Sequence, residues 1–181
     1  METANCTVKI LRPTSCTTSL GSNGKVVVLK NGNALTYKDS DDPDATEFTF
    51  DAGTIILAAN QVNVGDIFTI TVEAGNAPKE TYTAHIGGIY YPSPTGSVKK
   101  DAGSYTIPEA TLVGYGTIAY EKKTEGDGIV SGFDTTTRVA TLANSGIGNV
   151  EFEATLTPTS KTGWHYLSDT PTATFTLTVN N

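Results

Sequence analysis

Alternation of apolar and hydroxyl-bearing residues, with a period of two, is the feature that most limits what this chain can fold into. Near the C-terminus, threonine occupies every second position from Thr172 to Thr178, and apolar side chains lie between them. The segments 150–157, 68–72 and 81–86 alternate in a similar way. A period of two is that of a β-strand with one buried face. Because no segment shows the i, i+3, i+4 spacing of a buried helix face, the sequence predicts an all-β chain.

Short turns separate these strands. Asn31-Gly32 lies between two apolar runs, and both residues accept positive φ, so a tight hairpin is expected there. Further strands are predicted at 7–11, 25–30, 34–37, 47–50, 54–58, 112–122 and 138–142. Many short strands at close spacing are typical of an antiparallel β-sandwich, and we expect an immunoglobulin-like one.

The strongest internal boundary is the segment 91–97, where Pro92, Pro94 and small polar residues interrupt the strand pattern. It divides the chain into halves that are each close to the size of one immunoglobulin-like sandwich. We therefore expect an N-terminal arm at 1–22, a first sandwich region at 23–92 and a second at 93–181. One large sandwich over 23–181 is the alternative.

Charge and hydropathy exclude two classes of partner. The formal net charge is −7 and the pI is about 4.7, whereas nucleic-acid binding needs clustered Lys and Arg. No apolar run reaches the roughly 20 residues that span a bilayer. The N-terminus lacks the basic and apolar regions of a secretory signal, so we expect either synthesis without export or a leader already removed. Cys6 and Cys16 either pair or stay reduced.

One segment has the composition of a metal site. Asp39, Asp41, Asp42 and Asp44 place four carboxylates within six residues, and carboxylate oxygens are the ligands that Ca²⁺ prefers. The segment lacks the glycine and the terminal glutamate of an EF-hand. A structural calcium ion is therefore one interpretation and a solvated acidic turn is the other; no other cofactor is expected.

No reactive constellation indicates an enzyme. Nucleophilic catalysis usually needs a histidine base beside the nucleophile, and His85 and His165 lie in patterns typical of strand and loop residues. A glycosidase would need two carboxylates across a cleft, but Glu151 and Glu153 alternate with apolar residues on one strand, as an outer face does. The prediction is a chain without enzymatic activity.

Four aromatic residues are candidates for ligand binding. Trp164 and Tyr166 flank His165, and Tyr90 and Tyr91 precede the proline-containing segment. Exposed aromatic rings stack on sugars, so the four could form a glycan-binding platform. Aromatic residues beside turns also close the ends of sandwich cores, which is the alternative.

The segments 137–142 (TRVATL) and 146–155 (GIGNVEFEAT) carry a V-A-T-L strand, a glycine-containing turn and a strand that ends in A-T. This pattern resembles bacterial and phage immunoglobulin-like (Big-type) domains. The resemblance implies a β-sandwich of the kind found in bacterial surface adhesins and in virion proteins of tailed phages.

The resemblance leads to a hypothesis about function. We expect a non-enzymatic virion structural protein of a tailed phage, made in the host cytoplasm, most simply a capsid decoration (cement) or head-fibre protein. Its partner would be the major capsid protein, and local three-fold sites of a shell would suit a homotrimer. The segment 1–22 would then be the arm that attaches to the capsid. The alternatives are an extracellular carbohydrate- or cell-surface-binding module and a tail tube or filament subunit.

Overall fold

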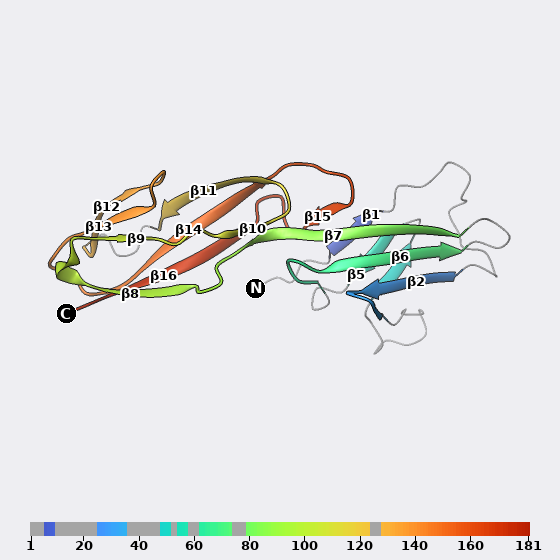
Figure 1. Cartoon of the computed structure of the whole chain (residues 1–181), viewed down its shortest axis with the longest axis horizontal. Coiled ribbons are helices and arrows are strands. Elements are labelled where there is room, and N and C mark those ends of the chain that lie inside the picture. Colours follow the sequence, from blue (N-terminus) through green and yellow to red (C-terminus); the bar gives the residue numbers. More distant parts are fainter. Residues whose placement is uncertain are drawn as a thin grey trace. The chain divides into compact units, whose positions relative to one another are not determined.

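The computed structural model describes residues 6–9, 25–35, 48–51, 54–57, 62–73, 79–123 and 128–181. The chain divides into two compact units (Figure 1). Unit 1 comprises Met1–Gly87 and Lys161–Leu167, and unit 2 comprises Gly88–Ser160 and Ser168–Asn181. The boundary expected from the sequence lies between residues 92 and 93, whereas the compact units divide between 87 and 88, and the later segment Lys161–Leu167 belongs to unit 1.

Unit 1 contains two sheets. The smaller is antiparallel, in the order β1 (Cys6–Lys9), β5 (Thr54–Leu57) and β4 (Phe48–Asp51). The larger has the order β7 (Glu80–Tyr90), β6 (Ile67–Glu73), β2 (Lys25–Lys30) and β3 (Asn33–Ala34). β15 (Trp164–Tyr166) pairs with β7 in parallel, and this pairing returns the segment 161–167 to unit 1.

The core of unit 1 is made by residues that alternate along these strands. Its buried side chains are Val28, Leu57, Val62, Phe68, Ile70, Ala84 and Ile86. Leu57 comes from the smaller sheet, whereas Val28, Phe68 and Ile70 come from the larger one. Apolar side chains of both sheets therefore share one core, which makes unit 1 a sandwich.

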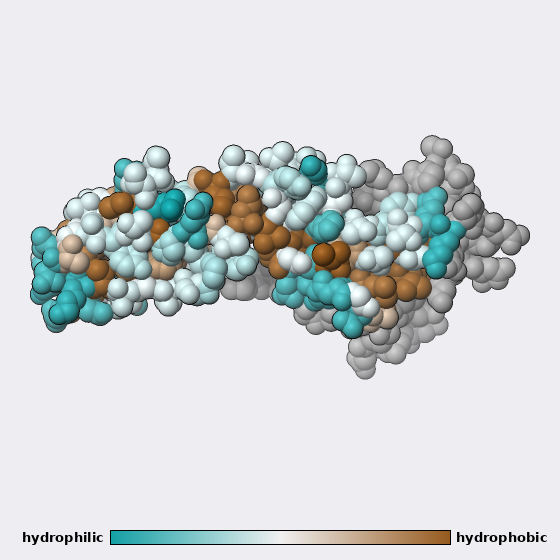
Figure 2. Space-filling model, viewed as in Figure 1, coloured by the Kyte–Doolittle hydropathy of each residue, from teal (hydrophilic) through white to brown (hydrophobic). Residues whose placement is uncertain are grey.

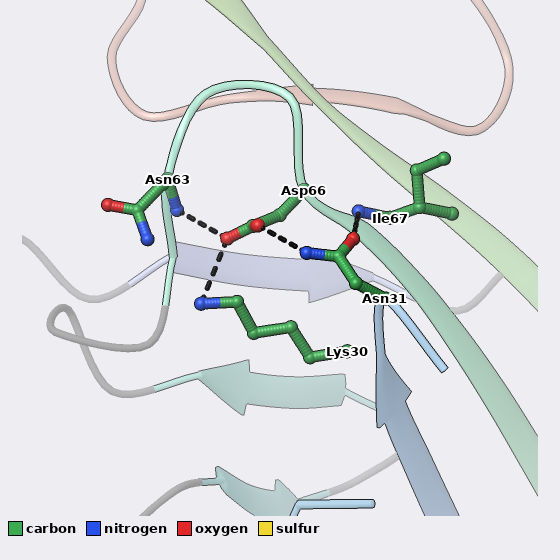
Figure 3. A network of polar contacts seen from close by, with 5 residues as sticks. All are labelled: Lys30, Asn31, Asn63, Asp66 and Ile67. Atoms are coloured by element: carbon green, nitrogen blue, oxygen red, sulfur yellow. Dashed lines mark hydrogen bonds and ion pairs between the residues drawn. The ribbon is translucent and has the colours of Figure 1, made fainter. Parts of the chain in front are cut away.

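A polar network ties the β2–β3 hairpin to the loop before β6 (Figure 3). The carboxylate of the buried Asp66 accepts hydrogen bonds from Asn31 Nδ2 (2.8 Å) and from the Asn63 N–H (2.8 Å). It also lies 3.1 Å from Lys30 Nζ. The Ile67 N–H donates to Asn31 Oδ1 (2.9 Å), so the side chain of Asn31 binds on both sides. These hydrogen bonds compensate the burial of a charge, which would otherwise be costly.

Unit 2 also contains two sheets. The first has the order β11 (Gly116–Lys122), β14 (Gly148–Pro158), β16 (Thr172–Asn180) and β8 (Thr95–Lys99). The second has the order β12 (Val130–Asp134), β13 (Val139–Leu142) and β9 (Ser104–Thr106). β10 (Thr111–Val113) pairs with the end of β7, and a single 3-10 turn, η2, spans Lys100–Ala102. Among the described strands, all pairings are antiparallel except β15 with β7 and β16 with β8.

Aromatic contacts join the two sheets of unit 2. Phe133 of β12 packs against Phe152 of β14 with ring centroids 4.8 Å apart, and Tyr105 of β9 stacks on Phe175 of β16 at 6.2 Å. Phe152 and Phe175 are fully buried. Unit 2 thus pairs a four-stranded with a three-stranded sheet, and unit 1 pairs a three-stranded sheet with the larger sheet of β15, β7, β6, β2 and β3. Two facing sheets are the layer arrangement of an immunoglobulin-like sandwich. The prediction of an all-β, sandwich-type chain is confirmed.

The predicted strand patterns are present with two informative differences. The hairpin at Asn31-Gly32 is confirmed, with φ of 49° and 86° and a Lys30–Asn33 pair. The segment 112–122, predicted as one strand, is two strands, because Gly114 has a φ of 106° and the chain changes sheet there. The segment 1–22, set apart as an arm, contains β1, which pairs with β5 of the unit 1 sandwich.

The outer faces of the strands carry hydroxyls rather than charges. Thr117, Thr157, Thr172 and Thr174 are all exposed. Figure 2 shows pale, near-neutral residues over much of the face that unit 2 presents in this view. Among the described residues, no helix is long and apolar enough to cross a membrane.

Candidate functional site

Unit 2 contains a cleft of about 900 Å³ between three segments of the chain. One wall is the residues 109–112 leading into β10, the second is β11, and the third is the turn that joins β12 to β13. The lining side chains are of four kinds: one cation, one carboxylate, hydroxyls and apolar groups. They are Arg138, Glu109, Thr111, Thr135, Thr136, Tyr120, Ala110, Leu112, Ile118 and Ala119, together with Gly116.

Tyr120 connects the walls of the cleft. Its hydroxyl accepts a hydrogen bond from the Ala110 N–H (3.2 Å), and the Arg138 guanidinium lies over its ring, 5.5 Å from the centroid. A guanidinium over an aromatic face is attracted by the ring quadrupole. One residue of β11 therefore holds both opposite walls in place.

The position of Arg138 is determined by its backbone and by its side chain. Its φ of 59° is unusual for a residue with a side chain. Its carbonyl accepts the Ile107 N–H (2.9 Å), and its Nε donates to the Ile107 carbonyl (3.3 Å). The guanidinium is thus anchored at one nitrogen, and its terminal nitrogens form no hydrogen bond with the residues that the structure describes, so they can donate to a ligand in the cleft.

The turn before Arg138 is closed by Asp134. The Oδ1 atom of Asp134 accepts hydrogen bonds from the N–H groups of Thr136 (2.8 Å) and Thr137 (3.0 Å). These backbone bonds, that from Thr137 first, lower the pKa of Asp134 because they favour the charged carboxylate. The hydroxyls of the turn are therefore held on an ordered backbone.

Tyr91 lies near Tyr120 and Arg138. Its side chain is buried against Phe175, with ring centroids 5.5 Å apart, and its hydroxyl has no hydrogen-bond partner among the described residues. Burial raises the pKa of Tyr91 to about 12; Tyr120 adds to the shift and Arg138 opposes it. The hydroxyl is therefore neutral at physiological pH.

The four aromatic candidates divide between the units. Trp164 and Tyr166 lie on β15 in unit 1, both half-buried. Trp164 stacks on His85 (centroids 4.9 Å apart, planes at 17°), and Tyr166 covers Gly87, where an added Cβ would collide with its ring. In unit 2, Tyr90 is 45% exposed whereas its neighbour Tyr91 is only 7% exposed. The structure thus places Trp164 and Tyr166 on one strand of unit 1, where Trp164 contacts His85 and Tyr166 contacts Gly87, and it buries Tyr91 in unit 2.

The predicted calcium ligands Asp39, Asp41, Asp42 and Asp44 lie outside the described residues, as does Cys16. Within the described ranges, no three His, Cys, Asp or Glu side chains come together as a group that could hold a metal ion.

The remaining candidates from the sequence are two histidines, His85 and His165, and two glutamates, Glu151 and Glu153. Burial lowers the pKa of His165, which keeps the imidazole neutral over a wider pH range. Glu151 is exposed on β14, and Glu153 forms an ion pair with Lys123 (2.7 Å). Neither histidine nor either carboxylate lines the cleft of unit 2.

The cleft residues Glu109, Tyr120 and Arg138 could not be recognised as a group from the sequence. They are separated by 11 and 18 positions in the chain, so no local motif joins them. The sequence contained one signal: Arg138 follows three consecutive threonines in a hairpin turn, at a position where glycine or asparagine would be usual.

No model of a known protein family matches the sequence, and no curated protein does. Among solved structures, the chain is similar to a Drosophila N-cadherin EC1-3 fragment (11% identity, TM-score 0.36, covering 88% of this chain and 56% of that one). It is also similar to the Ig1-2 module of the Drosophila receptor protein tyrosine phosphatase DLAR (13% identity, TM-score 0.32, covering 87% of this chain and 84% of that one). A third similar structure is that of Sidekick-1 immunoglobulin domains 1-4 (13% identity, TM-score 0.32, covering 98% of this chain and 47% of that one). The chain spans little more than half of the N-cadherin fragment. At these TM-scores the matches add nothing to the sandwich that the chain's own strands establish.

Proposed function

We propose that this chain is a non-enzymatic binding module whose recognition site is the cleft of unit 2. The observation that carries the proposal is the way in which Arg138 and Tyr120 are held there, by hydrogen bonds to Ile107 and Ala110 and by stacking on each other. A preformed concave site with a few fixed polar groups is the usual form of a ligand-binding site.

The proposal includes a setting. The chain is a virion structural protein of a tailed phage, a capsid decoration or head-fibre protein, which attaches to the major capsid protein as a homotrimer. The support is the resemblance of the segments 137–142 and 146–155 to immunoglobulin-like domains of such proteins. The first of these segments includes Arg138 of the cleft.

Two exposed positions on β11 allow a matched test of the cleft. Ala119 lines the cleft and Thr117 does not, although both lie exposed on the same face of the strand. Ala119→Trp should fill the cleft and abolish binding to phage heads that lack the protein, measured by co-sedimentation. Thr117→Trp should bind as the wild type does. Equal binding by both variants would contradict a role for the cleft.

Oligomeric state tests the setting separately. Size-exclusion chromatography with light scattering over a wide concentration range should give a discrete trimer. A stable monomer would contradict the decoration role and favour the cell-surface alternative, whereas open polymers would favour a tail or filament subunit.

The second candidate is an extracellular carbohydrate- or cell-surface-binding module. It is favoured by the combination of the Tyr120 ring with the Thr135 and Thr136 hydroxyls in one cleft, and by the presence of Trp164 and Tyr166 two positions apart on β15. A glycan array with Ala119→Trp and Trp164→Ala would identify which group binds. Loss of binding in only one variant assigns the site, and no binding by the wild type contradicts this candidate.

A further inference from the structure

β11 is the longest strand at the end of a sheet among the described residues. β11 has seven residues, whereas the edge strands β8 and β12 have five each. One side of β11 pairs with β14, and no described strand pairs with its other side. Natural proteins usually protect such an edge with proline, bulges, inward charges or short length. The strand Gly116–Lys122 has an uninterrupted register with β14, and charged residues occupy only its last two positions.

The hydrogen bonds between β11 and β14 show which backbone groups of β11 point outward from the sheet. Thr159 N–H donates to the Tyr115 carbonyl and Lys123 N–H donates to the Glu151 carbonyl, and both pairs continue the β11–β14 register. Bonded positions alternate in an antiparallel ladder, so odd-numbered residues of β11 face β14. The N–H and C=O groups of Ile118 and Tyr120 therefore point away from β14, where no described strand pairs with them.

The cleft lies along this edge. Three consecutive β11 residues line it, namely Ile118, Ala119 and Tyr120. Side chains of consecutive residues point to opposite faces of a strand, so a space lined by all three borders the edge itself. An extended chain placed there can form ladder hydrogen bonds with Ile118 and Tyr120.

The charges beside the edge indicate what such a chain would carry. Arg138 is anchored by Ile107 and Tyr120, and among the described residues no carboxylate forms an ion pair with it. Glu109 is exposed, so water screens its charge more strongly than that of the half-buried Arg138. Arg138 is therefore the charge that the cleft holds in a fixed position, and a guanidinium can bind a carboxylate through two parallel N–H donors.

We propose that an extended segment of a partner protein, carrying an acidic side chain, adds to β11 as a further strand and places its carboxylate on Arg138. This inference rests on the proposed binding function of the cleft and names the chemistry of its partner. A second copy of the chain is the less favoured occupant of this edge, because two copies of net charge −7 repel each other; the homotrimer of the proposed function would associate through another face.

The test uses the full chain and a seven-residue peptide, the length of β11. The peptide is capped at both ends and alternates threonine and valine around one central glutamate. In NMR titrations, amide exchange should slow at Ile118 and Tyr120. A peptide with glutamine in place of the glutamate should bind about tenfold more weakly, since a hydrogen-bonded charge pair is lost.

Three variants test the direction of the charge effect. Arg138→Gln should weaken binding of the glutamate peptide about tenfold and remove its preference over the glutamine peptide. Glu109→Gln should strengthen binding, because a like charge is removed. Lys99→Gln, on the opposite edge strand of the same sheet, should leave binding unchanged. The two peptides on the wild-type chain provide the comparison even if Arg138→Gln does not fold.

Three results would overturn the inference: no protection at Ile118 and Tyr120, equal binding of the two peptides, or protection that grows with protein concentration without peptide. If phage heads or glycans still bind through the cleft, the proposed function stands and only the strand-addition mode fails. If the peptide binds but Ala119→Trp has no effect on head or glycan binding, the proposed function fails instead.

Discussion

Asp66 shows how a single polar residue is accommodated at the end of a sandwich core. Its side chain is about 10% exposed, and three donors surround it: Lys30, Asn31 and the Asn63 N–H. Burial tends to raise the pKa of Asp66, but the hydrogen bonds from Asn63 and Asn31 and the contact with Lys30 together lower it. The carboxylate is thus stabilised more in the folded chain than in water.

The lowered pKa predicts a pH-dependent contribution to stability. Because the pKa of Asp66 lies below its ordinary value of 3.8, the contribution is complete above that pH and is lost as pH falls through the folded-state value. Asp66→Asn should lower the free energy of unfolding by about 2 kcal/mol at pH 7, and the difference from wild type should shrink below pH 4. Urea unfolding at several pH values measures this. The exposed Asp101→Asn is the control, and an Asp66→Asn effect that did not change with pH would contradict the prediction.

Among the elements, β15 shows how three residues can belong to a sheet that is distant in sequence. Trp164, His165 and Tyr166 pair in parallel with residues 85–87 of β7, and Gly163 contributes its carbonyl to the His85 N–H (2.7 Å). Gly87 is needed because the Tyr166 ring occupies the space of a Cβ. The glycine therefore determines where the segment 161–167 docks.

Gly87→Ala should displace the Tyr166 ring and loosen β15. The chain has one tryptophan, and it lies in this strand, so its fluorescence emission reports the change directly. We expect a shifted emission and a loss of about 1–2 kcal/mol in the free energy of unfolding. Gly128→Ala is the control, since an added Cβ there meets nothing within 4 Å. Unchanged Trp164 emission in Gly87→Ala would show that the ring contact is not required.

β1 gives the N-terminal segment a structural role besides any role in attachment. Its four residues pair with β5, whose Leu57 is fully buried in the unit 1 core. Deletion of residues 1–22 removes this strand, and we expect it to lower the urea midpoint followed by Trp164 emission. Deletion of residues 1–5 retains β1 and should leave the midpoint unchanged. If both deletions leave it unchanged, the segment 1–22 acts only as an arm.

The whole chain is acidic, and the described strands carry many hydroxyls on their exposed faces. Its net charge of −7 and pI near 4.7 oppose non-specific association of the protein at neutral pH. Only 17% of the residues are charged, so little other charge opposes association once the net charge vanishes. Threonine supplies the polarity of the strand faces instead.

Solubility should therefore have a minimum close to pH 4.7. Static light scattering during an acid titration should rise as this pH is approached and fall again below it. High salt should weaken the difference between pH 7 and the minimum, because salt screens the repulsion. Scattering that does not vary between pH 7 and pH 4 would contradict this account.

The sequence alone determined the local structure of this protein. Alternation of threonine with apolar residues predicted the strands, and the buried positions of β14 and β16 follow it residue by residue, including Phe152 and Phe175. Asn31-Gly32 predicted its hairpin for the same reason: backbone preferences and a period of two act between neighbouring residues, so they can be read from a short window.

Only the tertiary structure decided which distant segments meet. It returned the segment 161–167 to unit 1, buried Tyr91, and placed Glu109, Tyr120 and Arg138 around one cleft. It also left the outer edge of β11 without a strand beside it in the described part of the chain. Register and sheet order depend on how whole strands pack their apolar faces together, and that free energy is shared among residues far apart in the sequence. A pattern within a short segment of the sequence therefore cannot predict these long-range contacts.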